Sequence, residues 1–186
     1  MKLKKCNAVL SLLATVLLLA HLGYSCFAYL TFYYNPLLTK LLAIPFMVIV
    51  CLHAVCGMSA VFLQSDGTRP DLYPVQNRAT YLQRLSAALI FPLMILHINT
   101  FGLLQSSAEA GKTGFVLLLM LSGPLFFADI LTHTAVSVSR ALITLGILSS
   151  RDAQKRLDRV IYGIGAVAFA AASFTVVRGQ IAMFLH

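Results

Sequence analysis

Five long runs of apolar residues, separated by short polar segments, account for nearly the whole chain. Each run is long enough to cross a bilayer as a helix, because about 20 apolar residues rising about 1.5 Å each span a hydrocarbon core of about 30 Å. The pattern therefore predicts an all-α integral membrane bundle of five transmembrane helices that forms a single domain over residues 1–186. The predicted spans are about 8–34, 38–63, 83–104, 114–139 and 160–183.

The composition agrees with this pattern and narrows the class of protein. Hydrophobic residues make up 59% of the 186 residues, and charged residues make up only 11%. A soluble domain carries about 25% charged residues, so the chain has no aqueous domain of its own. Any chemistry that it supports therefore takes place inside the membrane or on a partner protein.

The distribution of basic residues predicts the orientation of the bundle. The net charge of +8 would suit a nucleic-acid partner, but the lysines and arginines lie mainly in the segments on one side of the five spans. With the N-terminus inside, eleven of them lie in inner segments and three in outer segments. The positive-inside rule then predicts a multi-pass protein of the cell (inner) membrane with its N-terminus inside, its C-terminus outside and no nucleic-acid partner.

The N-terminal basic residues and the cysteines have plain structural explanations. Lys2, Lys4 and Lys5 precede an apolar run, as in a signal peptide, but the run continues to about Tyr34 and predicts a retained first helix. The cysteines form no C-x-x-C pair and most lie in apolar runs. We therefore expect the three in apolar runs, Cys26, Cys51 and Cys56, to be small buried packing residues, and we expect neither a disulfide framework nor a zinc site. The cysteines are Cys6, Cys26, Cys51 and Cys56.

Four of the five predicted spans carry one histidine each. An ionisable side chain inside the hydrocarbon core is costly and marks a functional-site hypothesis. Two imidazoles from separate helices that face each other across about 4 Å can hold a haem, so four such residues favour haem binding over interhelical hydrogen bonds alone. The helix rise places His53 and His133 about 10–16 Å deep and His21 and His97 about 20 Å deep, which allows one haem or two.

Several polar residues accompany these histidines. Asp129, His133 and Arg140 share one stripe of the fourth span because they are four and seven residues apart. Asp129 could orient His133 or carry protons, or it could stay neutral and hydrogen-bond a neighbouring helix. Arg84 and Arg140 lie on the inner side, where haem propionates need arginines. Thr80 and Arg84 share a helix face, either as a binding pair or as a helix cap and a positive-inside anchor.

These residues resemble those of the membrane cytochrome b subunit of the succinate dehydrogenase/fumarate reductase family, in its single-chain, five-helix form. The likeness extends over nearly the whole chain as a pattern of sparse residues. It lies in His21 of the first span, in Leu52-His53-Ala54, in Gln83-Arg84-Leu85-Ser86 with His97 beyond it, and in His133-Thr134-Ala135-Val136-Ser137-Val138-Ser139-Arg140 followed by a basic segment.

The resemblance implies an anchor that relays electrons between a quinone and soluble flavoprotein and iron–sulfur subunits on the inner face. It implies a non-catalytic or quinone-reactive subunit, with menaquinone or ubiquinone as the diffusible partner. In that family, histidines of helices one, two, four and five hold two haems b. His21, His53 and His133 match three of these positions and the fifth span has no histidine, so one haem is the central expectation, with none or two also open. Thr80 and Arg84 resemble a hydroxyl–arginine pair at a quinone head group.

Two other classes of protein fit the same spans. A haemless membrane anchor or assembly partner would use the histidines for helix packing. It would use the segment Ser149–Arg159, expected to be a basic amphipathic inner loop, to dock a soluble protein. A small-solute transporter would usually show internal repeats, and none is convincing here. A reduced-minus-oxidised spectrum separates a haem protein from both alternatives.

Overall fold

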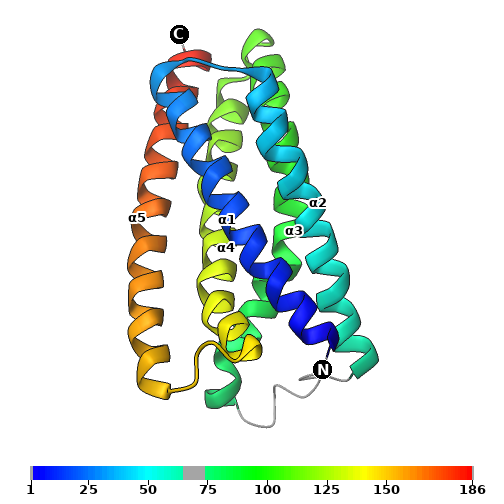
Figure 1. Cartoon of the computed structure of the whole chain (residues 1–186). Coiled ribbons are helices and arrows are strands. Elements are labelled where there is room, and N and C mark those ends of the chain that lie inside the picture. The colour runs from blue at the N-terminus through cyan, green and yellow to red at the C-terminus, as the bar shows by residue number, and fades with distance from the viewer. Residues whose placement is uncertain (1, 65–73, 186) are drawn as a thin grey trace.

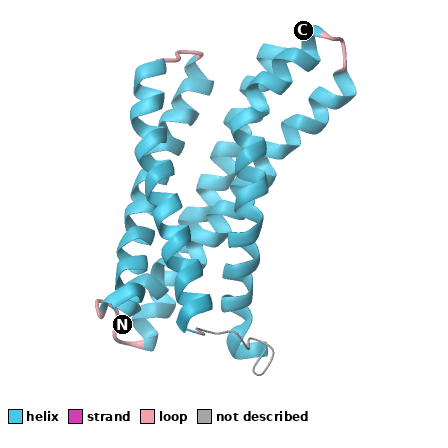
Figure 2. Cartoon of the chain, turned by 90° about the vertical axis from the view of Figure 1, so that its right-hand side faces the viewer, coloured by secondary structure: helices cyan, strands magenta, loops and turns pink. Residues whose placement is uncertain are grey.

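The computed structural model describes residues 2–64 and 74–185, and all of its regular structure is helical (Figures 1 and 2). Each of its five helices is long and apolar enough to cross a membrane, which confirms the predicted all-α, five-helix architecture. Asp66, Arg69 and His186 lie outside the described residues. The helices are α1 (Lys2–Thr31), α2 (Pro36–Gln64), α3 (Pro74–Glu109), α4 (Thr113–Leu145) and α5 (Arg151–Phe184).

The helices extend beyond the apolar spans, and the expected inner loop at Ser149–Arg159 is wrong. Helix α5 already begins at Arg151. Ser150 caps it, because its hydroxyl accepts a hydrogen bond from the Ala153 amide at 3.1 Å. Asp152 in the first turn further favours this helix start, since an acid there complements the helix dipole. Local capping therefore extends the helix through a segment whose charge suggested a loop.

Helices α1 and α2 form an antiparallel hairpin, as the Asn35-Pro36 pair predicts. The Asn35 side chain accepts a hydrogen bond from the Leu38 amide at 3.1 Å and so caps the start of α2. The Asn35 amide in turn donates to the Tyr24 hydroxyl at 2.8 Å, which ties the connection back to α1. The short connection keeps the two helices adjacent along their length.

The N-terminus and the C-terminus lie at opposite ends of the bundle (Figure 1). We call the end that contains the start of α1 the N-terminal end, and the other end the C-terminal end. Helix α4 is central, since it packs against α1, α3 and α5, and it contributes the largest share of buried residues. The main core cluster joins α1, α3, α4 and α5, and it consists of Leu18, Ile90, Phe126, Phe127, Ile130, Leu131, Ala172 and Val176.

Helix α2 has an exceptional position in this bundle. Among the described residues, its Cα atoms come within 8 Å of those of α1 and of no other helix. It lies on the opposite side of the bundle from α5 (Figure 1). The backbone of α2 is thus held away from α3 and α4, and only longer side chains bridge the separation. One of those side chains is His53.

Candidate functional site

The imidazole rings of His53 of α2 and His133 of α4 lie next to each other. Their ring centroids lie 6.3 Å apart, and their planes make an angle of 65°. Both side chains are partly buried within the bundle. The sequence left His53 and His21 open as partners of His133, and the structure brings His53 to it.

Each ring of this pair is oriented through its Nδ1 atom by an oxygen of a neighbouring helix. His53 Nδ1 lies 3.3 Å from the Asn7 carbonyl oxygen of α1. His133 Nδ1 lies 3.1 Å from the Gln83 carbonyl oxygen of α3, and 3.1 Å from the Ser86 hydroxyl. A carbonyl oxygen can only accept, so each ring donates from Nδ1 and carries its lone pair on Nε2. Nε2 is then the atom of each ring that can bind a metal.

The side chain of Gln83 links this site to the charge of Arg140. Its amide nitrogen donates to the Ser137 hydroxyl at 2.9 Å, and its amide oxygen accepts from Arg140 Nη1 at 2.7 Å. The same residue thus holds His133 through its main chain and Arg140 through its side chain. The sequence analysis expected Arg140 to face a haem propionate. In the structure, its Nη1 donates a hydrogen bond to the Gln83 amide oxygen.

The geometry of the His53–His133 pair fits bis-histidine haem binding. With each nitrogen about 2 Å from an iron and each ring centroid about 1 Å further out, the two centroids would lie about 6 Å apart. The observed separation is 6.3 Å. No group of three or more His, Cys, Asp or Glu side chains within residues 2–64 and 74–185 could hold a metal ion. A pair of imidazoles therefore suits an iron whose other four ligands belong to a macrocycle.

His21 and His97 form a second pair with different surroundings. The two imidazoles lie close enough to interact electrostatically. His97 stacks on Phe126 with a centroid distance of 4.7 Å and meets Phe127 edge-on at 6.2 Å. His21 stacks on Phe46 at 6.0 Å. This grouping matches the two depths expected from counting residues along each helix.

Two buried polar atoms near these pairs have no hydrogen-bond partner among the described residues, namely Nδ1 of His21 and Oδ2 of Asp129. The expectation that Asp129 orients His133 is therefore not met, because Gln83 and Ser86 occupy the hydrogen-bonding positions at His133 Nδ1. The reason is geometric: a neighbouring helix presents oxygens to Nδ1, whereas Asp129 lies one turn away on the same helix. Asp129 stays a candidate for proton transfer.

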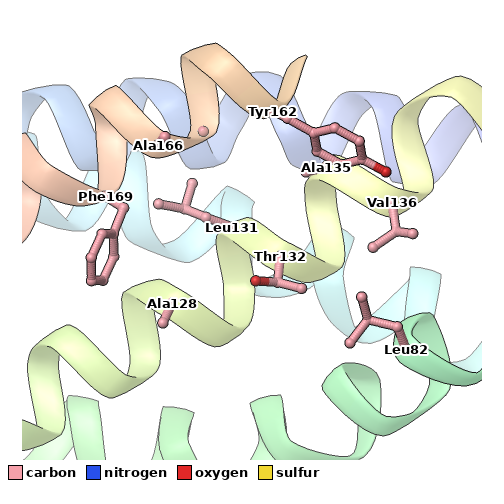
Figure 3. A pocket seen from close by; sticks show the side chains of 10 residues that line it. Leu82, Ala128, Leu131, Thr132, Ala135, Val136, Tyr162, Ala166 and Phe169 are labelled. Atoms are coloured by element: carbon pink, nitrogen blue, oxygen red, sulfur yellow. The ribbon is translucent and has the colours of Figure 1, made fainter. Parts of the chain in front are cut away.

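An apolar groove of about 360 Å³ lies between α3, α4 and α5 (Figure 3). Leu82 of α3 lines it, on the side of this helix opposite to Thr80 and Arg84, because residues two apart on a helix do not share a face. Hydroxyl groups reach the groove from Thr132 of α4 and from Tyr162 of α5, as Figure 3 shows. The remaining lining residues are Ala128, Leu131, Ala135, Val136, Gly165, Ala166 and Phe169.

Charged residues gather near one end of this groove. Arg140 interacts electrostatically with Arg84, with Tyr162 and with Asp158. Thr80 and Arg84 are both partly buried on the early turns of α3. The hydroxyl groups of Thr132 and Tyr162 lie at the edge of an apolar groove, which is a combination that suits a ligand with an apolar body and a few polar atoms.

Sequence reasoning identified the histidines but missed the residues that orient them. Asn7 acts through its main-chain oxygen, so its side chain carried no signal. Gln83 and Ser86 were noted only as part of a motif. Their spacing of three residues places them on one face of α3 with Ile90, and polar residues on the buried face of an apolar helix are a usable signal.

The site therefore contains two pairs of imidazoles at different depths, one held by polar groups and one by aromatic rings, with an apolar groove beside the first. These features rest on contacts between helices that are distant in sequence. No protein-family model, curated protein or solved structure matches this chain.

Proposed function

We propose that this chain is the membrane-anchor and electron-transfer subunit of an oxidoreductase complex, similar to the cytochrome b subunit of succinate dehydrogenase/fumarate reductase. Its function is to relay electrons between a quinone and a soluble flavoprotein and iron–sulfur partner. One observation carries the proposal. Two imidazoles from separate helices lie 6.3 Å apart, and each has its Nδ1 hydrogen-bonded to an oxygen of another helix.

In this proposal His53 and His133 would hold haem b through their Nε2 atoms. Haem b, when bound, supplies reversible one-electron transfer at its iron. The chain contributes the ligand nitrogens, the oxygens of Asn7, Gln83 and Ser86 that fix the ring orientations, and an apolar interior that excludes water. Among the described residues, the Cα atoms of α2 come within 8 Å of α1 alone, so a macrocycle would lie where the backbones of α2 and α4 are separated.

His21 and His97 offer a second haem position. Phe126, on which His97 stacks, and His133 are seven residues apart on α4, and this spacing corresponds to about 10 Å along the helix. Two positions at this spacing would distribute redox centres across the bilayer. The buried Nδ1 of His21, which has no partner among the described residues, shows that this ring is not already committed there to a structural hydrogen bond.

The proposal places the quinone head group at Thr80 and Arg84, which share one face of α3 because they are four residues apart. A guanidinium and a hydroxyl can each donate a hydrogen bond to a quinone carbonyl. Asp129 is the candidate carrier for the protons that quinone chemistry consumes or releases.

The quinone site is tested by Arg84→Ala, with Arg78→Ala as the matched control because Arg78 is an exposed arginine on the same helix. Arg84→Ala should lower the rate with a soluble quinone analogue by at least about tenfold, since a charged hydrogen bond is worth about 1.5–3 kcal/mol. The control should keep the normal rate. Unchanged kinetics in Arg84→Ala would leave Arg84 as a topology anchor.

The proposed orientation places the N-terminal end of the bundle inside. Basic residues at the start of α5, namely Arg151, Lys155, Arg156 and Arg159, would then face the soluble partners. Single cysteines replacing Asp152 and Glu109 in a cysteine-free chain should react with an impermeant maleimide from opposite sides of a vesicle. Labelling of both positions from the same side would contradict the five-span topology.

The haem assignment is tested by a reduced-minus-oxidised spectrum and a pyridine haemochrome assay on the full chain purified from haem-replete cells. The expected result is a b-type spectrum with one or two haems per chain. A colourless protein, purified with its soluble partners present, would overturn the assignment and favour a haemless anchor. Solute uptake by vesicles that contain the colourless protein would favour a transporter.

A further inference from the structure

The thiols of Cys6 and Cys56 lie next to each other at the N-terminal end of the bundle. Cys6 belongs to α1 and Cys56 to α2, and their side chains lie close enough to interact. Both cysteines are free, with Cys6 exposed and Cys56 partly buried. The sequence suggested only packing roles for the four cysteines, and 49 residues separate these two in the chain.

The packing of α1 against α2 holds this pair in register. The residue after Cys6 contacts α2 on both sides of Cys56. The Asn7 carbonyl oxygen lies 3.3 Å from His53 Nδ1, and the Asn7 amide oxygen lies 3.6 Å from the Cβ position of Gly57. The register of α1 against α2 thus brings the segments that contain Cys6 and Cys56 together.

We propose that Cys6 and Cys56 are a redox modification site that forms a reversible disulfide and fastens α1 to α2. The inference does not depend on haem binding or on quinone chemistry. The α1–α2 hairpin is already joined at the C-terminal end by the connection at residues 32–35, and a disulfide would join it at the other end. Because α2 packs closely only against α1, this bond would hold α2 in place beside the rest of the bundle.

The oxidant in this proposal is a low-molecular-weight disulfide such as oxidised glutathione. The thiolate of exposed Cys6 attacks one sulfur of that disulfide, forms a mixed disulfide and releases one molecule of glutathione. The thiolate of Cys56 then attacks Sγ of Cys6, the Cys6–glutathione bond breaks, and the second glutathione leaves. The two protein thiols are oxidised, one disulfide is reduced to two thiols, and the two thiol protons end on the glutathione products.

The site also has a structural consequence for His53. The Asn7 carbonyl that orients this imidazole directly follows Cys6, and His53 lies three residues before Cys56. A disulfide between the cysteines would restrain both partners of that hydrogen bond. The redox state of the thiols would therefore set how firmly His53 is positioned.

The test uses the full chain in lipid vesicles, treated with oxidised glutathione, blocked with N-ethylmaleimide and digested for mass spectrometry. The expected product is an intramolecular Cys6–Cys56 disulfide that exceeds every other pairing by at least about tenfold, because neighbouring thiols have a high effective concentration. Dithiothreitol should reverse it. Cys6→Ser and Cys56→Ser should abolish this product, whereas Cys26→Ser and Cys51→Ser should retain it.

A second measurement tests whether the Cys6–Cys56 disulfide stabilises the contact between α1 and α2 or only shows that the two thiols react. Oxidised wild-type protein should have a higher Tm than the reduced protein, and Cys56→Ser should show no such difference under the same treatment. Full retention of four free thiols would overturn the proposal, and so would a disulfide that involves Cys26 or Cys51 or links two chains. A Cys6–Cys56 bond that leaves Tm unchanged would overturn the fastening of α1 to α2.

Discussion

The two histidine pairs are made of the same residue type in the same bundle, but different neighbours hold them. His53 and His133 each donate from Nδ1 to an oxygen of an adjacent helix. His21 and His97 instead stack on phenylalanine rings, and Nδ1 of His21 has no hydrogen-bond partner among the described residues. Hydrogen bonds fix both the tautomer and the plane of a ring, whereas stacking fixes only its plane.

This difference indicates that the two pairs would not be equivalent as ligands of the proposed haem. His53 and His133 are already oriented by hydrogen bonds, so they lose less conformational entropy when they bind a ligand. His21 and His97 would have to adopt one tautomer and one orientation during binding. We therefore expect the His53–His133 position to bind haem more tightly and the His21–His97 position to be filled second or not at all.

The largest expected effect is on haem content. His133→Ala should remove the haem of the first position completely, because it removes one of the two imidazoles proposed to hold it. His97→Ala should leave that haem bound and at most alter its potential or remove a second haem. Ile98→Ala, an exposed neighbour of His97, serves as the control.

Haem per chain, measured as the pyridine haemochrome, compares these variants directly. Equal loss of haem in His133→Ala and His97→Ala would show that the two positions act as one unit. Complete loss in His97→Ala with retention in His133→Ala would reverse the ranking of the two pairs.

A smaller effect is expected from forcing α2 away from α1. The Cβ position of Gly57 lies 3.6 Å from the Asn7 amide oxygen, so alanine fits there but leucine must displace α1 or α2. Gly57→Leu should lower the free energy of unfolding by about 2–3 kcal/mol. Gly23→Leu is the matched control, since no atom lies within 4 Å of its Cβ position.

Thermal unfolding in detergent measures the change in stability, and haem retention reports on the His53–Asn7 hydrogen bond. Gly57→Ala should behave like wild type in both assays. If Gly23→Leu destabilises the chain as much as Gly57→Leu, the α1–α2 contact at Asn7 has no special role in holding His53.

The smallest expected effect comes from the Gln83 side chain. Gln83→Leu removes hydrogen bonds to Ser137 and Arg140 but keeps the main-chain carbonyl that accepts from His133. Interhelical hydrogen bonds in membranes are worth about 1 kcal/mol, so the loss of stability should be of that size, and haem should stay bound. The control is Asn99→Leu, because the Asn99 amide donates only within its own helix, to the Ile95 carbonyl oxygen at 2.7 Å.

The change in the midpoint of thermal unfolding distinguishes the two leucine variants, and a redox titration of the bound haem adds a second comparison. Gln83→Leu should shift the reduction potential, because Arg140 loses the acceptor that places its charge near His133. A potential that is unchanged in Gln83→Leu would limit this network to a structural role.

Much of the architecture could be predicted from the sequence because it depends on local properties. The length of each apolar run sets a helix that can cross a membrane, and Asn35-Pro36 sets the turn between α1 and α2. The residue count from each helix end also placed the histidines at two depths. The exact ends of the helices were harder to predict from the sequence. For example, Ser150 caps α5, and the helix therefore includes a charged segment that was expected to be a loop.

The pairing of residues across helices was decided only by the tertiary structure. The helical period determines which side chains share a face, but it does not determine how two helices rotate or cross, because that depends on packing between residues far apart in the chain. The partner of His133, the oxygens at its Nδ1, the separation of α2 from α4 and the contact between Cys6 and Cys56 all depend on this packing. The sequence by itself determined which chemical groups lie inside the membrane, and the tertiary structure determined which of those groups meet.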